Sequence, residues 1–228
     1  TQSKNWVVLT YVVAPKFDVI FGFAAVKKNG SEVSGDTHTF LRIDEHKFLL
    51  GLCDGMGSGV NAEKASSTSI SLIENFYKAG FDNETILTSV NKLLSLSQDE
   101  VFTAVDVCVM DLQEGICDFI KIGATYGFVK SKNSVEIISA GSLPLGVLEE
   151  MKPCITKKAL SDGDTVVVVS DGITDAFATK EELATKIAQI ALKTPQETAD
   201  VLLAAALEKD GNEAKDDMTV VVAQIFEK

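Results

Sequence analysis

The amino-acid sequence predicts an α+β fold, a β-sandwich of two mainly antiparallel sheets flanked by paired helices. Short apolar runs rich in β-branched residues recur along the chain and predict strands. Two pairs of neighbouring segments instead place apolar residues at helical spacing. Strands and helices do not alternate one by one, as a regular βαβ arrangement requires. A layered sandwich therefore fits the order of elements better than a parallel sheet.

Size and charge limit the class of protein. The 228 residues, 46% of them hydrophobic, are enough for one sizeable core, so we expect residues 1–228 to form a single domain. The formal net charge is -12. An acidic surface repels nucleic-acid backbones and anionic lipids, so we expect neither nucleic acid nor a membrane to contact this domain. A site for a phosphorylated substrate would need bound metal ions to supply local positive charge.

The chain opens with predicted strands. Val7–Val13 and Val19–Val26 are apolar, β-branched runs on either side of Pro15, and this pattern is typical of a hairpin. Thr37–Ile43 and Lys47–Cys53 follow as strands joined by a polar turn.

The period then changes to that of helices. The loop Asp54–Gly59 holds three glycines, which allow close backbone approach to a ligand. Val60–Lys78 has helical spacing and ends at Gly80. Asp82 or Asn83 caps a second helix, whose predicted apolar face consists of Ile86, Leu87, Val90, Leu93 and Leu94.

Strands resume after this helix pair. They are predicted at Ala104–Asp111, Ile116–Ile122, Tyr126–Lys130 and Val135–Ile138, followed by a loop over Ser139–Gly146 and a buried strand at Thr165–Ser170. Glu181–Lys193 and Pro195–Lys209 form the second helix pair, with a proline near the start of the latter, where its missing N–H is harmless. Thr219–Phe226 is the last predicted strand.

Four short acidic motifs accompany these strands. They are Val33-Ser34-Gly35-Asp36, Cys53-Asp54-Gly55-Met56-Gly57, Ser170-Asp171-Gly172 and Asp216-Asp217-Met218-Thr219. Each places an aspartate at the end of a β-type run or just before one, where a stiff backbone can direct it to a shared point. Crowded carboxylates repel one another unless a cation offsets their charge. Oxygen ligands alone favour Mg²⁺ or Mn²⁺ over zinc.

The motifs therefore predict a metal-dependent hydrolase. A two-metal site lowers the pKa of a water molecule, which can then attack phosphorus in line without a covalent enzyme intermediate. The competing interpretation is structural, because Asp-Gly is also a common tight-turn dipeptide. Asp106 lies inside an apolar strand and is a further ligand candidate, or simply a hydrogen-bonded acid.

The four motifs also carry a resemblance. Their order and approximate spacing are similar to those of the metal-dependent serine/threonine phosphatases of the type 2C-like (PPM) family, and the similarity covers essentially the whole chain. Leu143-Pro144-Leu145-Gly146 and the Pro195-Gln196 helix start extend the resemblance to its bacterial sporulation members. The family implies the PPM phosphatase fold, a β-sandwich with flanking helices and two Mn²⁺ or Mg²⁺ ions between the sheets.

The resemblance also implies roles for individual residues. Asp54 matches the ligand that bridges the two ions. Asp36 and the carbonyl of Gly55 match ligands of one ion, and Asp171 and Asp216 match ligands of the other. Eukaryotic members grip phosphate with an arginine near the first strand. The one arginine here, Arg42, matches no motif, so no phosphate-binding cation is assigned.

For substrate and location, the resemblance implies dephosphorylation of a phosphoserine on an anti-anti-sigma protein, which activates a sporulation sigma factor. It also implies a larger protein, anchored in the membrane through segments outside this chain, with this domain at the cytoplasmic face. Because the glycine loop after Asp54 leads straight into the first helix pair, we also hypothesise that partner binding or self-association as a homodimer through these helices assembles the metal site. Two alternatives remain: a catalytically weak phosphatase-like module that binds a phosphorylated regulatory partner, and a hydrolase of small phosphate esters.

Overall fold

The computed structural model describes residues 11, 13–57, 59–96, 102–139, 142–148, 154–191 and 193–228. Ten strands in this part of the chain form two five-stranded sheets, and every neighbouring pair of strands is antiparallel. The β1 sheet has the spatial order β1 (Phe17–Val26), β10 (Met218–Glu227), β9 (Thr165–Val169), β6 (Gly127–Lys130) and β7 (Val135–Ile138). The β2 sheet has the order β2 (Asp36–Arg42), β3 (Lys47–Gly55), β4 (Thr103–Asp111), β5 (Ile116–Ile122) and β8 (Cys154–Ala159).

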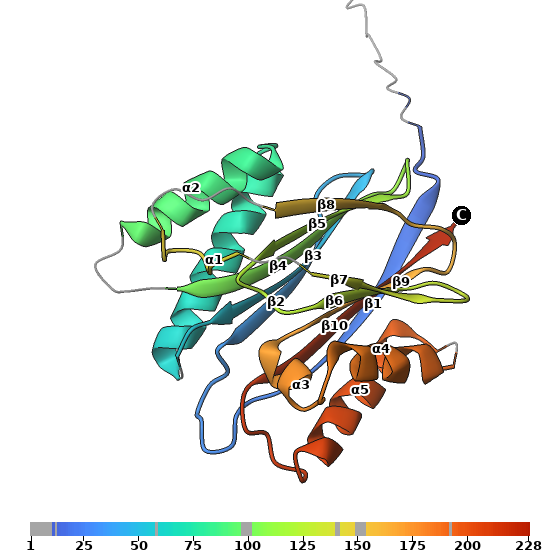
Figure 1. Cartoon of the computed structure of the whole chain (residues 1–228). Coiled ribbons are helices and arrows are strands. Elements are labelled where there is room, and N and C mark those ends of the chain that lie inside the picture. The colour runs from blue at the N-terminus through green and yellow to red at the C-terminus, as the bar shows by residue number, and fades with distance from the viewer. Residues whose placement is uncertain are drawn as a thin grey trace, which may run out of the picture.

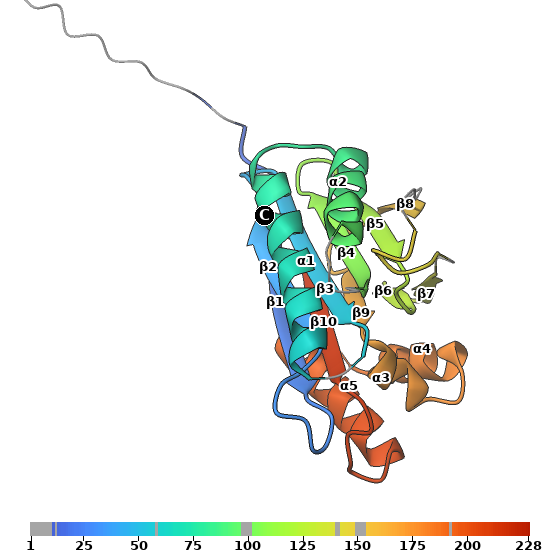
Figure 2. The same cartoon turned by 90° about the vertical axis from the view of Figure 1, so that its left-hand side faces the viewer.

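Helices cover the outer faces of both sheets (Figures 1 and 2). The first pair, α1 (Val60–Lys78) and α2 (Asn83–Ser95), packs on the β2 sheet. The other three, α3 (Asp171–Asp175), α4 (Lys180–Gln189) and α5 (Pro195–Lys209), pack on the β1 sheet. The result is a four-layered sandwich, which confirms the predicted fold class.

Burial on both faces explains why the central strands are apolar throughout rather than alternating. In β3, Leu49 packs under the first helix pair while Leu50 packs between the sheets. In β9, Val167 faces the second set of helices, and Val166 and Val168 face the inner layer. None of the helices in the described ranges is long and apolar enough to span a bilayer.

The first strand of the predicted hairpin of Val7–Val13 with Val19–Val26 falls mostly outside the described residues. Of this strand, Tyr11 and Val13 are described, and neither belongs to a strand. In the described part of the chain, β1 pairs with β10, with Phe17 opposite Glu227 and Val26 opposite Met218. The sequence did not predict this pairing, because the two strands lie at opposite ends of the described chain.

Other differences concern short or polar elements. Strand β8 was not predicted, because its sequence Cys154–Ala159 carries two lysines and lacks apolar alternation, as suits an edge strand. The five-residue helix α3 is too short to show a period. Helix α4 ends at Gln189, earlier than Lys193. Leu93 is 48% exposed rather than part of the buried face of α2, where Asn91 lies instead.

Candidate active site

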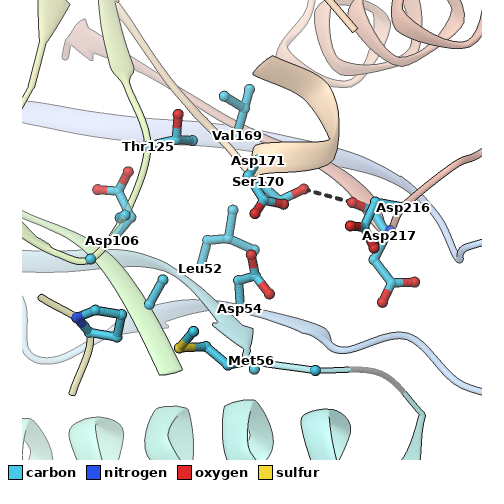
Figure 3. A pocket seen from close by; sticks show the side chains of 16 residues that line it. Leu52, Asp54, Met56, Asp106, Thr125, Val169, Ser170, Asp171, Asp216 and Asp217 are labelled. Atoms are coloured by element: carbon cyan, nitrogen blue, oxygen red, sulfur yellow. Dashed lines mark hydrogen bonds between the residues drawn. The ribbon is translucent and has the colours of Figure 1, made fainter. Parts of the chain in front are cut away.

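A cleft of about 350 Å³ lies where β3 and β9 end and the chain enters β10. Three of the predicted acids, Asp54, Asp171 and Asp216, line it. Figure 3 shows that Asp54 and Asp171 approach this space from opposite sides, with Asp216 beside them. The remaining predicted acid, Asp36, is not among the residues that line the cleft. It lies on the neighbouring strand, directly opposite Asp54 in the antiparallel register of β2 and β3.

Helix α1 fixes the end of β3. A Cβ at position 55 would lie 1.9 Å from the carbonyl oxygen of Ala62, in the first turn of α1, so only glycine fits there. The backbone N–H of Gly55 donates to the carbonyl of Gly35 at 3.1 Å, and the hydroxyl of Thr103 donates to the carbonyl of Asp54 at 2.9 Å. Gly55 is therefore required for helix packing as well as for any approach to a ligand.

Asp36 and Asp54 hold their protons unusually strongly. Burial raises the pKa of Asp36 to about 6, helped by the charges of Asp217 and Asp171 and opposed by the hydroxyls of Thr219 and Ser170. Both carboxylate oxygens of Asp36 are buried, and neither has a donor in good hydrogen-bond geometry among the described residues, so the nearby hydroxyls of Thr219 and Ser170 offset the burial only in part. Two buried acceptors without donors indicate a place prepared for a cation or proton.

Asp54 and Asp171 form the centre of the acidic cluster. Burial raises the pKa of Asp54 to about 8, and the carboxylates of Asp36, Asp171 and Asp216 add to the shift. Burial also raises the pKa of Asp171, with Asp216 the next cause. Shifts of this kind mark carboxylates that are crowded without a compensating positive charge.

Asp171 and Asp216 reach the cleft because two chain segments approach closely. A Cβ at position 172 would lie 2.2 Å from the carbonyl oxygen of Asp217. The hydroxyl of Ser170 donates to that same carbonyl at 3.3 Å and accepts from the N–H of Thr219 at 2.8 Å. Gly172 and Ser170 thus lock the start of α3 against the start of β10.

Asp217 has a role that the sequence did not reveal. Its carboxylate accepts from the backbone N–H of Lys28 at 2.8 Å and from that of Gly35 at 2.7 Å. It therefore holds the 27–35 loop, and with it Asp36, against the start of β10. The ammonium of Lys28 lies 3.6 Å from Asp216. No sequence spacing links positions 28 and 217, so only the fold could show this.

Asp106 lines the other wall of the cleft (Figure 3). One of its oxygens forms an ion pair with Lys121 of the neighbouring strand, and the side chains are 2% and 1% exposed. Its second oxygen is buried without a hydrogen bond to any described residue. The sequence suggested either a ligand or a hydrogen-bonded acid; in the structure, Asp106 is the acidic half of a buried ion pair.

The donor chemistry of the cleft fits a hard divalent cation. All candidate ligands are oxygens, and crowding disfavours their ionised forms unless positive charge is added. Among the described residues, no three Asp, Glu, His or Cys side chains already converge closely enough to enclose a metal ion. Arg42 lies at the end of β2 opposite to Asp36, away from the cleft, and forms an ion pair with Asp18.

Comparisons with known proteins agree with this geometry. The family model described as stage II sporulation protein E (SpoIIE) matches residues 44–226. Stage II sporulation protein E of Bacillus subtilis is 33% identical over 214 residues, which cover 92% of this chain and 26% of that protein. The phosphoserine phosphatase RsbU of the same organism is 21% identical over 206 residues, covering 87% of this chain and 61% of RsbU. The chain thus spans about a quarter of the first relative.

Solved structures show the same architecture. A structure of the PP2C phosphatase domain of Bacillus subtilis SpoIIE with a fragment of its regulatory domain is 30% identical, with a TM-score of 0.86. The match covers 92% of this chain and 64% of that one. RsbX in complex with magnesium, at 17% identity and a TM-score of 0.74, covers 91% of this chain and 95% of RsbX, and at that identity it shares the fold.

Proposed function

Because the chain belongs to the stage II sporulation protein E family and is a PP2C-type serine phosphatase domain, we propose that it removes phosphate from a phosphoserine of an anti-anti-sigma protein. In this proposal the reaction activates a sporulation sigma factor. The name of the RsbU relative supports a phosphoserine phosphatase, and the name of the SpoIIE relative supports a role in sporulation. The match covers only 26% of the SpoIIE relative, which supports a larger protein. In this proposal that protein is anchored in the membrane and carries this domain on its cytoplasmic face.

The observation that carries the proposal is the crowding of carboxylates in one cleft. Asp54 and Asp171 line it together with Asp216, and Asp36 stands directly behind Asp54. Burial and mutual repulsion raise the pKa of three of these acids, so their cluster calls for positive charge. A phosphate monoester is also anionic, so these carboxylates would repel it unless bound cations separate the carboxylates from the phosphate.

We propose that two Mn²⁺ or Mg²⁺ ions are held here by the predicted residues. Asp54 would bridge them, Asp36 and the Gly55 carbonyl would bind one, and Asp171 and Asp216 the other. When bound, such ions supply an activated water molecule and neutralise phosphoryl charge. The magnesium complex of RsbX supports a divalent ion in this fold.

The protein contributes the placement of the ligands. Asp217 holds the loop before Asp36 through two backbone N–H groups, and Thr103 holds the carbonyl of Asp54. Ser170 ties the segment that carries Asp171 to the segment that carries Asp216. These contacts act on the backbone of the segments that carry the proposed ligands, so they place the ligands without using the carboxylates of Asp36, Asp54 or Asp171.

The alternative function, a module that binds a phosphorylated partner without turnover, predicts the loss of cleft acids. All four are present, which favours an enzyme. The test is release of phosphate from a phosphoserine anti-anti-sigma protein and from p-nitrophenyl phosphate, each with Mn²⁺ and with chelator. Metal-dependent release from the phosphoprotein supports the proposal. Binding without release supports the module, and turnover of the aryl ester alone supports a hydrolase of small esters.

A further inference from the structure

A second cavity adjoins the cleft. It has a volume of about 430 Å³ and is bounded by the entry to β6, by α3 and by the start of α4. Ala124 and Thr125 line both hollows. At their boundary the hydroxyls of Thr125 and Thr174 lie 3.0 Å apart. A molecule that occupies the cleft and extends past Thr125 therefore enters this second cavity.

Lys180 is the notable charge in this cavity. It is the first residue of α4, where the partial positive charge of the helix end disfavours a cation. Its ammonium lies over the ring of Tyr126, 5.1 Å from the centroid. It forms no ion pair within 4.0 Å in the described part of the chain, although Asp175 lines the same cavity. A partly buried cation is thus held in place without an anion.

We propose that this cavity is a substrate subsite for the polypeptide next to the phosphoserine, and that Lys180 pairs with an acidic side chain of that segment. The inference rests on the proposed function and names the part of the substrate that the cleft leaves unbound. Continuity with the cleft supports a chain that passes from one hollow into the other. Charge supports an acidic residue, because Lys180 lines this cavity and forms no ion pair in the described part of the chain, on a protein whose net charge of -12 otherwise repels acidic segments.

The composition of the cavity also suits a peptide rather than a small anion. Hydroxyls of Thr125 and Thr174 can exchange hydrogen bonds with a main chain, and the rings of Tyr126 and Phe177 offer apolar contact. A small aryl phosphate has neither a main chain nor an acidic side chain for this cavity to bind. Lys180 is therefore expected to affect phosphopeptides and not aryl esters.

The test compares phosphoserine peptides that differ only in the position of one glutamate, within three residues on either side of the phosphoserine, with p-nitrophenyl phosphate, all at saturating Mn²⁺. For the peptide that the parent hydrolyses with the highest kcat/KM, we expect Lys180→Glu to lower kcat/KM about five- to tenfold, mainly by raising KM. The reason is that the substituted glutamate repels the glutamate of the peptide, which Lys180 attracts. Turnover of the aryl ester stays at the parent value. Lys180→Arg keeps the cation and retains most of the activity.

The matched control is Lys186→Glu, the same charge reversal on the same helix but outside this cavity. A glutamate in the first turn of α4 is favourable for the helix, and Lys180→Gln provides a second, neutral variant. The subsite is wrong if Lys180→Glu and Lys180→Gln both keep the parent's kcat/KM on every peptide, or if they slow the aryl ester as much as the peptides. A parent that hydrolyses neither substrate class refutes the proposed function itself, and the subsite with it.

Discussion

Asp36 and Asp54 occupy directly opposed positions on the antiparallel strands β2 and β3, so two acids share one cross-strand pair. Like charges at such positions destabilise a sheet. Burial is the main cause that raises the pKa of Asp36 to about 6 and that of Asp54 to about 8. The pair therefore costs stability whenever both groups ionise without a cation, and this cost makes it a sensitive point for experiment.

The first prediction is a pH-dependent stability of the metal-free protein. Both acids keep their protons to higher pH in the folded chain than in the unfolded chain, where the pKa is ~3.9. Their contribution to the free energy of unfolding is therefore fully present below about pH 4. It is lost as the pH rises through about 6 for Asp36 and about 8 for Asp54. Asp54→Asn should flatten this fall and melt no lower than the parent at pH 8 in chelator. Exposed Glu213→Gln is the control, and a clearly lower melting temperature of Asp54→Asn would show a structural role instead.

The second prediction concerns turnover. Asp171→Ala should abolish Mn²⁺-dependent phosphate release while the far-ultraviolet circular dichroism and melting temperature stay near those of the parent, because it removes a ligand and no core volume. The control is Asp44→Ala, which removes an acid from the distant turn between β2 and β3. Near-normal turnover of Asp171→Ala with saturating metal would contradict the two-metal assignment.

A third prediction follows from the contact between Gly55 and α1. Gly55→Ala places a methyl group against the Ala62 carbonyl, so α1 must shift. Overpacking of this kind costs about 1–3 kcal/mol, which urea unfolding can measure, and the displaced backbone should also weaken Mn²⁺ activation. Gly30→Ala is the comparison, because its Cβ meets nothing within 4 Å, although its φ of 84° adds a backbone strain that Gly55→Ala lacks. A loss for Gly55→Ala no greater than that for Gly30→Ala would contradict a costly clash with α1.

The fourth prediction tests the buried ion pair. Lys121→Met leaves the Asp106 carboxylate buried and uncompensated, which costs about 3–5 kcal/mol. Asp106→Asn combined with Lys121→Met removes both charges and should be clearly more stable than the sum of the single changes implies. Denaturant unfolding of the four proteins gives the coupling energy. Additive effects would mean that the two side chains do not interact in solution.

The last prediction concerns control by the first helix pair. Leu87 and Val90 lie on the buried face of α2, and α1 packs against Gly55. A displacement of these two helices would therefore disturb the Gly55 carbonyl, a proposed ligand. We expect Leu87→Ala and Val90→Ala to change the Mn²⁺ concentration needed for half-maximal activity, through a shift between helix positions. If every folded variant keeps the parent's rate and metal dependence, the pair is scaffold only.

Local chemistry explains what the sequence could predict. Apolar runs such as Thr165–Ser170 and helical spacing in Val60–Lys78 specify their elements, because burial on one or two faces leaves a pattern in the chain. The ordered acids likewise include three residues that line the cleft, Asp54, Asp171 and Asp216, whereas Asp36 lies on the strand beside Asp54. The sequence did not predict the order of the strands in each sheet, the hydrogen bonds of Asp217 to the 27–35 loop, or the ion pair of Asp106 with Lys121. Those depend on residues brought together only by the complete fold.

The pairing of β1 with β10 affects how the molecule is made. Strands of the β2 sheet all lie between β2 and β8 in chain order, so that sheet can form while later residues are still untranslated. Strand β1 must wait for β10, the last strand, and Asp216 is delivered by the same segment. During synthesis, Asp216 therefore joins the other acids only when β10 completes the β1 sheet. A product that ends before this segment would lack both the last strand and Asp216.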